Sequence, residues 1–306
     1  MMKKYDDFIN ELKNGLEKQL GGQATVQIEE TERNNQTLKE VLCFSKKGEG
    51  IVIKSEIMKL YERYQVYGGN LEKLIRDLVS VLEENPRRTN QLGTGSWEEV
   101  KSKLVIRLVN RKWNAKYISK IPHFDLLDLT ATFQIVLEQP EFHNMACIVT
   151  NEMLQEWQIT EDDLKKAGLD NLRESDFTAS DIRKLIWGDM ESCLGLNEVE
   201  SDSLMNVIKN HRTGCGADVL LMPEILQNYA EQAGGNLFIL PCSIYEVIVI
   251  TENGWGNVTE LQMMVHEINQ TQVAREERLS DSVYYYRRDS GKVELGTDVK
   301  GVGKIA

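Results

Sequence analysis

The chain lacks the features of a membrane or secreted protein. No apolar run in its 306 residues approaches the roughly 20 residues of a membrane helix. Near its start, Asp6 and Asp7 stand where a secretory signal would need an unbroken apolar stretch. The five cysteines are scattered and form no Cys-x-x-Cys pair, which is typical of free thiols in a reducing compartment. We therefore expect a cytoplasmic protein that does not contact a membrane.

Patterns that hold metals and nucleotides are missing as well. The four histidines are isolated, with no His-x-x-x-His or Cys–His spacing. The Gly-x-Gly sequences stand outside the strand, loop and helix context of a phosphate-binding loop. Asp298-Val299-Lys300 matches an element of metal-dependent nucleases, but a glycine-rich tail cannot hold those side chains rigidly. The sequence predicts neither a metal nor a cofactor.

Positive charge is scarce, and the formal net charge is -12. The exception is the segment 96–120, which has seven basic residues against two acidic ones. An acidic protein disfavours nonspecific binding to nucleic acid or to an anionic membrane, although a local basic patch can override this effect.

What the sequence does contain is a succession of amphipathic and alternating segments, long enough for two domains or for one domain with an appendage. Apolar residues three and four apart predict helices at 3–20, 55–67, 70–84, 97–101, 111–120, 160–171, 180–190 and 223–233, and from 257 onward. Alternating or short apolar runs predict strands at 25–30, 38–45, 51–53, 104–109, 129–137, 145–149, 204–208, 217–221, 237–240, 244–250, 283–287 and 292–295. The fold class is therefore α+β, with helices packed on mixed, largely antiparallel sheets.

Composition divides the chain into five regions. The stretch 87–96 is rich in glycine, asparagine and arginine without apolar periodicity, and it is predicted to be a linker. It separates an N-terminal helix, hairpin and two-helix region (1–86) from a central α+β region (97–214). A C-terminal α+β module (215–295) follows, and residues 296–306 are predicted to form a flexible tail.

The C-terminal module has the clearest pattern. Its predicted order is strand, helix, strand, strand, helix, strand, strand, and successive antiparallel strands need no crossover connection. Pro223 lies in the first turn of the first helix, where proline is tolerated, and Asn257 with Glu260 forms a capping pair at the start of the second. A similar pair, Thr160 with Asp163, predicts the start of a helix in the central region.

Two stretches of this module carry distinctive motifs. One is an Ile-Leu-Pro-x-Ser turn that begins at Ile239 and continues into Leu240-Pro241-Cys242-Ser243-Ile244-Tyr245-Glu246-Val247, and the other is a Ser-Asp-x-x-Tyr-x-Tyr strand within Leu279 to Tyr286. With these motifs the chain resembles a family of bacterial proteins known only as a domain of unknown function, over most of its length. The resemblance implies serine and histidine where this chain has Cys242 and Tyr245, so neither position is expected to be essential to chemistry. It implies no activity.

One candidate for chemistry is Cys215. It stands between Gly214 and Gly216, four residues after His211, and a loop cysteine near a histidine can be an activated nucleophile. The alternative is a packed, unreactive thiol, which is what most intracellular cysteines are. We favour the packed thiol.

The turn after Pro241 is a second candidate. Cys242 and Ser243 follow the proline at a strand end, where side chains can project into a cleft, with Tyr245 and Glu246 close by. Turn chemistry explains the proline and the serine equally well. A binding or catalytic role here therefore depends on whether these side chains converge on a pocket.

The basic segment offers a third candidate. Lys112, Lys116 and Lys120 recur every four residues and share one face of the predicted helix, with Trp113 and Tyr117 between them. Such a strip could bind nucleic acid through phosphate contacts and stacking. However, Trp113 and Tyr117 are themselves four apart, so we favour a buried aromatic face with solvated lysines, and nucleic-acid binding is not expected.

Three consecutive tyrosines offer a fourth. In a strand, Tyr284 and Tyr286 point to one side while Tyr285 joins Val283 on the other. Tyrosine is favoured at protein interfaces. If the side of Tyr284 and Tyr286 is exposed, it is the preferred contact surface.

Two hypotheses of different classes follow. The favoured one is a non-catalytic cytoplasmic interaction or regulatory protein that binds a protein partner through its C-terminal sheet. The alternative is a small-substrate hydrolase or transferase that combines the 241–246 turn with the 214–216 loop. A concave pocket lined by several of the candidate residues His211, Cys215, Ser243, Tyr245 and Glu246 would favour the enzyme.

Overall fold

The computed structural model describes residues 3–22, 24–45, 51–84, 95–137, 145–181, 205–241, 243–252 and 257–298. The chain forms two compact units. Unit 1 comprises residues 1–100 with 137–147, and unit 2 comprises residues 101–136 with 148–306. Among the described residues, no helix has the length and apolar character needed to cross a bilayer.

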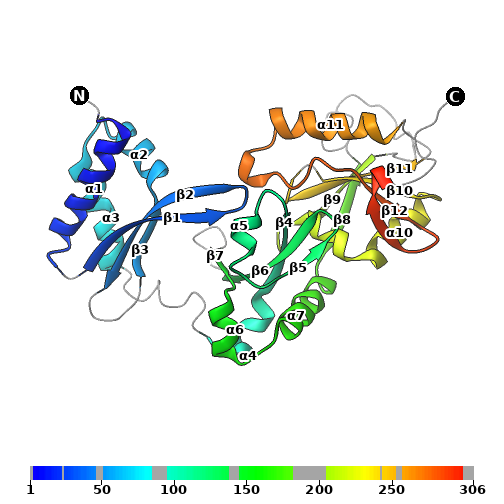
Figure 1. Ribbon diagram of the computed structural model, residues 1–306, viewed down its shortest axis with the longest axis horizontal. Coiled ribbons are helices and arrows are strands. Elements are labelled where there is room, and N and C mark those ends of the chain that lie inside the picture. Colours follow the sequence, from blue (N-terminus) through cyan, green and yellow to red (C-terminus); the bar gives the residue numbers. More distant parts are fainter. Residues whose placement is uncertain are drawn as a thin grey trace, which may run out of the picture. The chain divides into compact units, whose positions relative to one another are not determined.

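Unit 1 is built from helices on one antiparallel sheet (Figure 1). Its elements are α1 (Tyr5–Gln19), β1 (Ala24–Arg33), β2 (Gln36–Ser45), β3 (Ile51–Glu56), α2 (Ile57–Val66), α3 (Leu71–Glu84) and α4 (Trp97–Val100). The sheet order is β1-β2-β3. Phe8, Leu12 and Leu16 recur along one face of α1 and form the core with Val26 and Val41 of the sheet.

Unit 2 contains two sheets (Figure 1). The first part of its chain forms η2 (Lys101–Lys103), β4 (Leu104–Asn110), α5 (Ala115–Ile118), β5 (His123–Leu126), β6 (Leu129–Leu137), α6 (Asn151–Trp157), α7 (Glu161–Arg173), β8 (Phe177–Asp181) and β9 (Met205–Asn210). Between β6 and α6 in the sequence comes β7 (Met145–Ile148), of which all but Ile148 belongs to unit 1. The second part forms η3 (Gly216–Leu221), α10 (Pro223–Gln232), β10 (Leu237–Leu240), β11 (Glu246–Thr251), α11 (Val258–Thr271), η5 (Arg275–Glu277), β12 (Tyr284–Arg287), β13 (Lys292–Leu295) and η6 (Gly296–Asp298).

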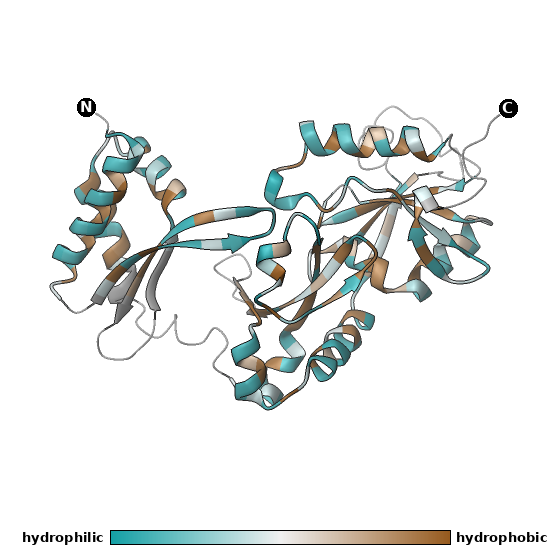
Figure 2. Ribbon diagram, in the orientation of Figure 1, coloured by the Kyte–Doolittle hydropathy of each residue, from teal (hydrophilic) through white to brown (hydrophobic). Residues whose placement is uncertain are grey.

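The larger sheet has six strands in the order β13-β12-β10-β11-β9-β8, all paired antiparallel. Strands of the predicted central region and of the predicted C-terminal module therefore share one sheet. Helix α11 covers it, with Leu261 and Val265 packed on Phe238 and Tyr285. Hydrophobic and hydrophilic residues alternate along this helix, as expected for a helix that lies on a sheet (Figure 2).

The smaller sheet follows the path β4-β6-β5. Helix α7 packs closely on it, because Gly168 leaves room for Ile106 and Phe133: a Cβ at this glycine would lie 3.0 Å from Ile106 Cγ1. The predicted caps of Thr160 with Asp163 and of Asn257 with Glu260 are both present, at α7 and α11. The α+β class with antiparallel sheets is confirmed.

One predicted element is wrong, and another is shorter than predicted. Residues 217–221 form the 3-10 helix η3 and not a strand. This apolar segment is buried along Gly216 to Leu220, so it has no polar alternation that could separate a strand from a buried turn of helix. Residues 111–120 form one turn of helix, α5, because Asn110 Oδ1 accepts a hydrogen bond from the Trp113 amide and diverts the preceding backbone into a turn.

Some elements have no counterpart in the prediction. These are the short strands β5 and β8 and the helix α6. The first two residues of the predicted helix 180–190 belong to β8, and the remainder lies outside the described residues. So does most of the predicted linker 87–96, and so do residues 299–306 of the predicted tail.

Candidate functional site

The 214–216 loop and the 241–246 turn meet in unit 2. The Gly216 amide donates a hydrogen bond to the Tyr245 carbonyl oxygen at 2.8 Å. Gly216 is required here for space: a Cβ would lie 2.5 Å from the Ile208 carbonyl oxygen and 2.7 Å from the Tyr245 carbonyl oxygen. The loop, β9 and the start of β11 therefore form one tightly packed junction.

A polar cluster lies at this junction. Arg107 of β4 contributes a half-buried guanidinium, close enough to the Cys215 thiol for a hydrogen bond. Asp218 of η3 is wholly buried, and its Oδ1 accepts a hydrogen bond from the Leu108 amide at 3.3 Å. Tyr245 of the turn lies close enough to Arg107 and Cys215 for their charges to act on it, and it is 42% exposed. We name Arg107, Cys215, Asp218 and Tyr245 the Arg107 cluster.

Burial dominates the proton equilibria of the Arg107 cluster. It raises the pKa of the Cys215 thiol to about 11, with a further rise from Asp218. It raises the pKa of Asp218 well above its ordinary value, although Arg107 acts in the opposite direction. Burial, followed by the Glu277 carboxylate, also raises the pKa of Tyr245. At neutral pH the cysteine and the tyrosine are therefore uncharged.

Two buried polar atoms of the Arg107 cluster lack a hydrogen-bond partner among the described residues: Arg107 Nε and Asp218 Oδ2. Within the same residues Arg107 forms no ion pair. Buried polar groups are nearly always paired in folded proteins, so these two atoms are unusual. Sequence reasoning missed both residues, since a single arginine and a single aspartate in apolar runs give no local signal.

The other candidate side chains of the nucleophile hypothesis form their contacts with residues outside the Arg107 cluster or within their own turn. His211 Nε2 lies 2.7 Å from Thr178 Oγ1, and Glu246 forms an ion pair with Lys209 at 3.2 Å. Ser243 Oγ accepts a hydrogen bond from the Tyr245 amide, which is turn chemistry. Cys242 lies outside the described residues. None of these side chains lines the shallow pocket between β4 and α7, whose wall includes Asn171 and Arg212.

Cys215 gives a direct test of the nucleophile hypothesis. Because the thiolate is the reactive form and the pKa is about 11, iodoacetamide at pH 7.5 should modify Cys215 of the folded protein at least roughly 100-fold more slowly than a free-thiol peptide. Mass spectrometry of peptides measures both rates, and the half-buried Cys147 serves as the internal control. Modification of Cys215 as fast as the peptide would contradict a packed thiol.

The three tyrosines of β12 are all buried. The Tyr286 hydroxyl donates to Gln227 Oε1 of α10 at 2.8 Å, and the Tyr284 hydroxyl donates to Asp128 Oδ1 at 2.7 Å. The condition for a contact surface on Tyr284 and Tyr286, an exposed face, is therefore not met. The motif has a structural role instead.

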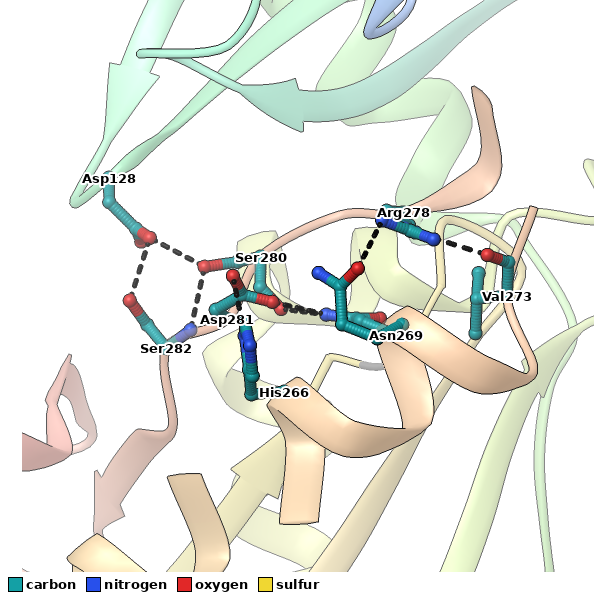
Figure 3. Close-up of polar contacts among 9 residues, drawn as sticks. Asp128, His266, Asn269, Val273, Arg278, Ser280, Asp281 and Ser282 are labelled. Carbon is teal, nitrogen blue, oxygen red and sulfur yellow. Dashed lines mark hydrogen bonds and ion pairs between the residues drawn. The ribbon is translucent and has the colours of Figure 1, made fainter. Parts of the chain in front are cut away.

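This role is seen in the contacts of Asp128, which lies in the turn between β5 and β6 (Figure 3). The Ser280 and Ser282 hydroxyls donate to Asp128 Oδ2 at 2.6 and 2.9 Å, in addition to the Tyr284 hydroxyl on Oδ1. Positions 280, 282 and 284 alternate, so all three side chains point to the same side of an extended segment. We name this arrangement the Asp128 clamp.

Helix α11 holds the other side of the segment (Figure 3). Asn269 Nδ2 donates to the Ser280 carbonyl oxygen at 2.9 Å and to Asp281 Oδ1 at 2.8 Å. His266 Nδ1 lies 3.3 Å from Asp281 Oδ2. The Ser-Asp-x-x-Tyr-x-Tyr motif thus fastens α11 and β12 to the smaller sheet.

The basic strip is only partly as predicted. Lys112, Lys116 and Lys120 are exposed, and Tyr117 is buried beside Val109, but Lys112 and Lys120 lie outside the single turn of α5. Trp113 is exposed. No group of three or more His, Cys, Asp or Glu side chains suited to a metal ion occurs among the described residues.

Comparison with known proteins gives one result. No curated protein and no solved structure matches the chain. A family model described as a family of unknown function, DUF5688, matches residues 5–288, which is nearly the whole chain and includes both motifs of the C-terminal module. The chain therefore belongs to the family of unknown function DUF5688.

Proposed function

We propose that this chain is a non-catalytic binding protein of the cytoplasm whose contact surface for a protein partner is centred on Tyr245, where β11 begins. This keeps the partner surface on the C-terminal sheet but moves it from β12 to the turn before β11. Cys43 and Cys215 form no disulfide within the described residues, which supports a reducing compartment.

The observation that carries the proposal is an exposed aromatic ring that lies near a cation. Tyr245 is 42% exposed, although the side chains on both sides of it are largely buried or in ion pairs. Its hydroxyl faces Glu277, and Arg107 is near enough to influence its pKa. Tyrosine and arginine are enriched among the few interface residues that carry most of the binding free energy.

The state of the reactive side chains supports binding over catalysis. A buried thiol with a raised pKa is a poor nucleophile, and His211 is bonded to Thr178 and not to Cys215. Ser243 and Glu246 are likewise engaged in a turn and in an ion pair. A nucleophile needs a base within hydrogen-bond reach, and among the described residues the side chains that hydrogen-bond to the Cys215 thiol are Arg107 and Thr213, neither of which is a base.

The test is affinity capture from the native cell extract with wild-type protein and with Tyr245→Ala. Loss of a central tyrosine should weaken partner binding by about 30-fold or more, so a partner retained by the wild type should be absent from the variant. Met263→Ala is the matched control, because Met263 is 62% exposed on α11 of the same unit. Equal retention of every bound protein by all three forms would contradict the proposal.

One observation favours the alternative, a small-substrate hydrolase or transferase. The hydrogen bond from Gly216 to Tyr245 brings together the two segments that such a site would need. Rapid and selective alkylation of Cys215 would favour the enzyme over the binding protein. The slow alkylation that we expect would count against the enzyme.

A further inference from the structure

Arg107 forms no ion pair within 4.0 Å among the described residues. Its side chain leaves β4 toward η3, its Nε is buried without a hydrogen-bond partner, and it has no ion pair within the described part of the chain. Removing a charge from water costs free energy unless an opposite charge or several hydrogen bonds compensate for it. A side chain in this state, beside an exposed tyrosine, is suited to a ligand that supplies the missing charge.

The neighbours of Arg107 do not supply it. The Cys215 thiol and the Tyr245 phenol are uncharged at neutral pH. Asp218 is the nearest carboxyl group, but burial favours its protonated form, and its Oδ2 makes no hydrogen bond. Arg107 is therefore the one side chain of the Arg107 cluster whose charge does not depend on pH in the physiological range.

The surface acids nearby are directed elsewhere. Glu246 pairs with Lys209 at 3.2 Å, and Glu277 faces the Tyr245 hydroxyl. Neither forms an ion pair with Arg107.

We propose that Arg107 binds an oxyanion, the carboxylate or phosphate group of an acidic or phosphorylated side chain on the protein partner. The inference rests on the proposed function, because it assigns the chemistry that the Tyr245 surface recognises. The planar fork of a guanidinium matches carboxylate and phosphate oxygens in two parallel hydrogen bonds. Tyr245 would pack on the rest of the partner side chain.

The overall charge argues for a single side chain over a polyanion. A net charge of -12 opposes long-range attraction of any strongly acidic molecule, including nucleic acid. Recognition by one half-buried guanidinium acts at short range instead. We therefore expect binding that depends on Arg107 itself and only weakly on total charge.

The test uses inorganic phosphate and acetate as probes of the full-length wild-type protein. Because Arg107 Nε is buried, its proton should exchange slowly and give an NMR signal, identified by its absence in Arg107→Lys. Addition of phosphate or acetate should shift this signal saturably at millimolar concentration, whereas sodium chloride of equal ionic strength should not. Saturation by phosphate alone assigns a phosphorylated side chain, and saturation by acetate assigns an acidic one. A linear shift, equal for chloride, would overturn the inference.

Partner capture separates this inference from the proposed function. Arg107→Lys keeps the positive charge but loses the planar fork of the guanidinium, so we expect it to reduce partner retention on the order of tenfold. Arg288→Met, a change at an exposed arginine, is the control and should not reduce retention. The circular dichroism spectrum of Arg107→Lys must first match that of the wild type. If the partner is then lost with Tyr245→Ala but fully retained with Arg107→Lys, the proposed function stands and the oxyanion site is refuted.

Discussion

Replacing Gly216 by alanine should destabilise unit 2 by about 3 kcal/mol or more. The new methyl group would lie 2.5 Å from the Ile208 carbonyl oxygen and 2.7 Å from the Tyr245 carbonyl oxygen, and both are backbone atoms. Neither can retreat easily, since Ile208 pairs with Val247 in the ladder between β9 and β11. The hydrogen bond from Gly216 to Tyr245 would be lost as well, at a further cost of about 1 kcal/mol.

Hydrogen exchange of the β9 and β11 amides at increasing urea concentration measures this loss where it occurs. Gly214→Ala in the same loop is the matched control. Gly214 has a φ of 71° but nothing within 4 Å of its Cβ position, so only conformational strain of about 1 kcal/mol is expected. Similar losses of stability in the two variants would show that close packing at Gly216 does not determine the cost of a side chain at this position.

Asp128→Ala is the second substitution expected to have a large effect. It removes the acceptor of three hydroxyl groups, and hydrogen bonds to a charged partner contribute roughly 1.5 to 3 kcal/mol each without being additive. We expect the free energy of unfolding to fall by roughly 3 to 5 kcal/mol. Asp128→Asn should lose less stability, because the amide keeps one acceptor oxygen. It still loses some, because the NH2 group is a donor that faces a hydroxyl donor.

Exchange protection of residues 279–286 measures the state of the Asp128 clamp directly. Asp125→Ala is the control, since Asp125 is exposed and accepts one hydroxyl, that of Thr130 at 2.7 Å, beside its surface ion pair with Arg111 at 2.9 Å. Surface ion pairs contribute up to about 1 kcal/mol. If Asp128→Ala loses no more stability than Asp125→Ala, the three hydroxyls do not depend on their common acceptor.

Features that depend on nearby residues could be predicted from the sequence. The cap at Thr160 needs only Asp163, and the cap at Asn257 needs only Glu260, so a window of four residues contains the whole signal. The pairing of β10 with β11 across a short turn is equally local. The α+β class follows from the order of such segments.

Features that depend on distant residues could not be predicted. Leu108 donates to Asp218 across 110 positions, and this contact helps to hold η3 as a 3-10 helix beside β4. An isolated apolar run carries no information about such a partner, so a strand was the natural expectation at 217–221. The site has the same limitation: the loop of Cys215 and the turn of Tyr245 stood out locally, whereas Arg107 and Asp218 became significant only through the fold.

The tyrosine motif lies between these cases. Its alternation of Ser280, Ser282 and Tyr284 is a local pattern, and it correctly placed Tyr284 and Tyr286 on one side of a strand. Exposure could not be derived from it, because Gln227 of α10 and Asp128 cover those hydroxyls from other parts of the chain. Candidate contact surfaces inferred from strand faces are therefore provisional until the covering helices are known.

The Asp128 clamp also bears on how unit 2 folds. It joins positions that are 152 to 156 residues apart, whereas the β10–β11 hairpin closes over a few residues. Closing so long a loop costs entropy before any contact is made, and proteins rich in distant contacts fold slowly. The clamp should therefore form late, after the hairpin, and a nascent chain that ends before Tyr284 cannot complete it. Until then, the apolar face of α11 and the edge of β10 that pairs with β12 stay uncovered, which makes this interval the one in which unit 2 is most prone to aggregate.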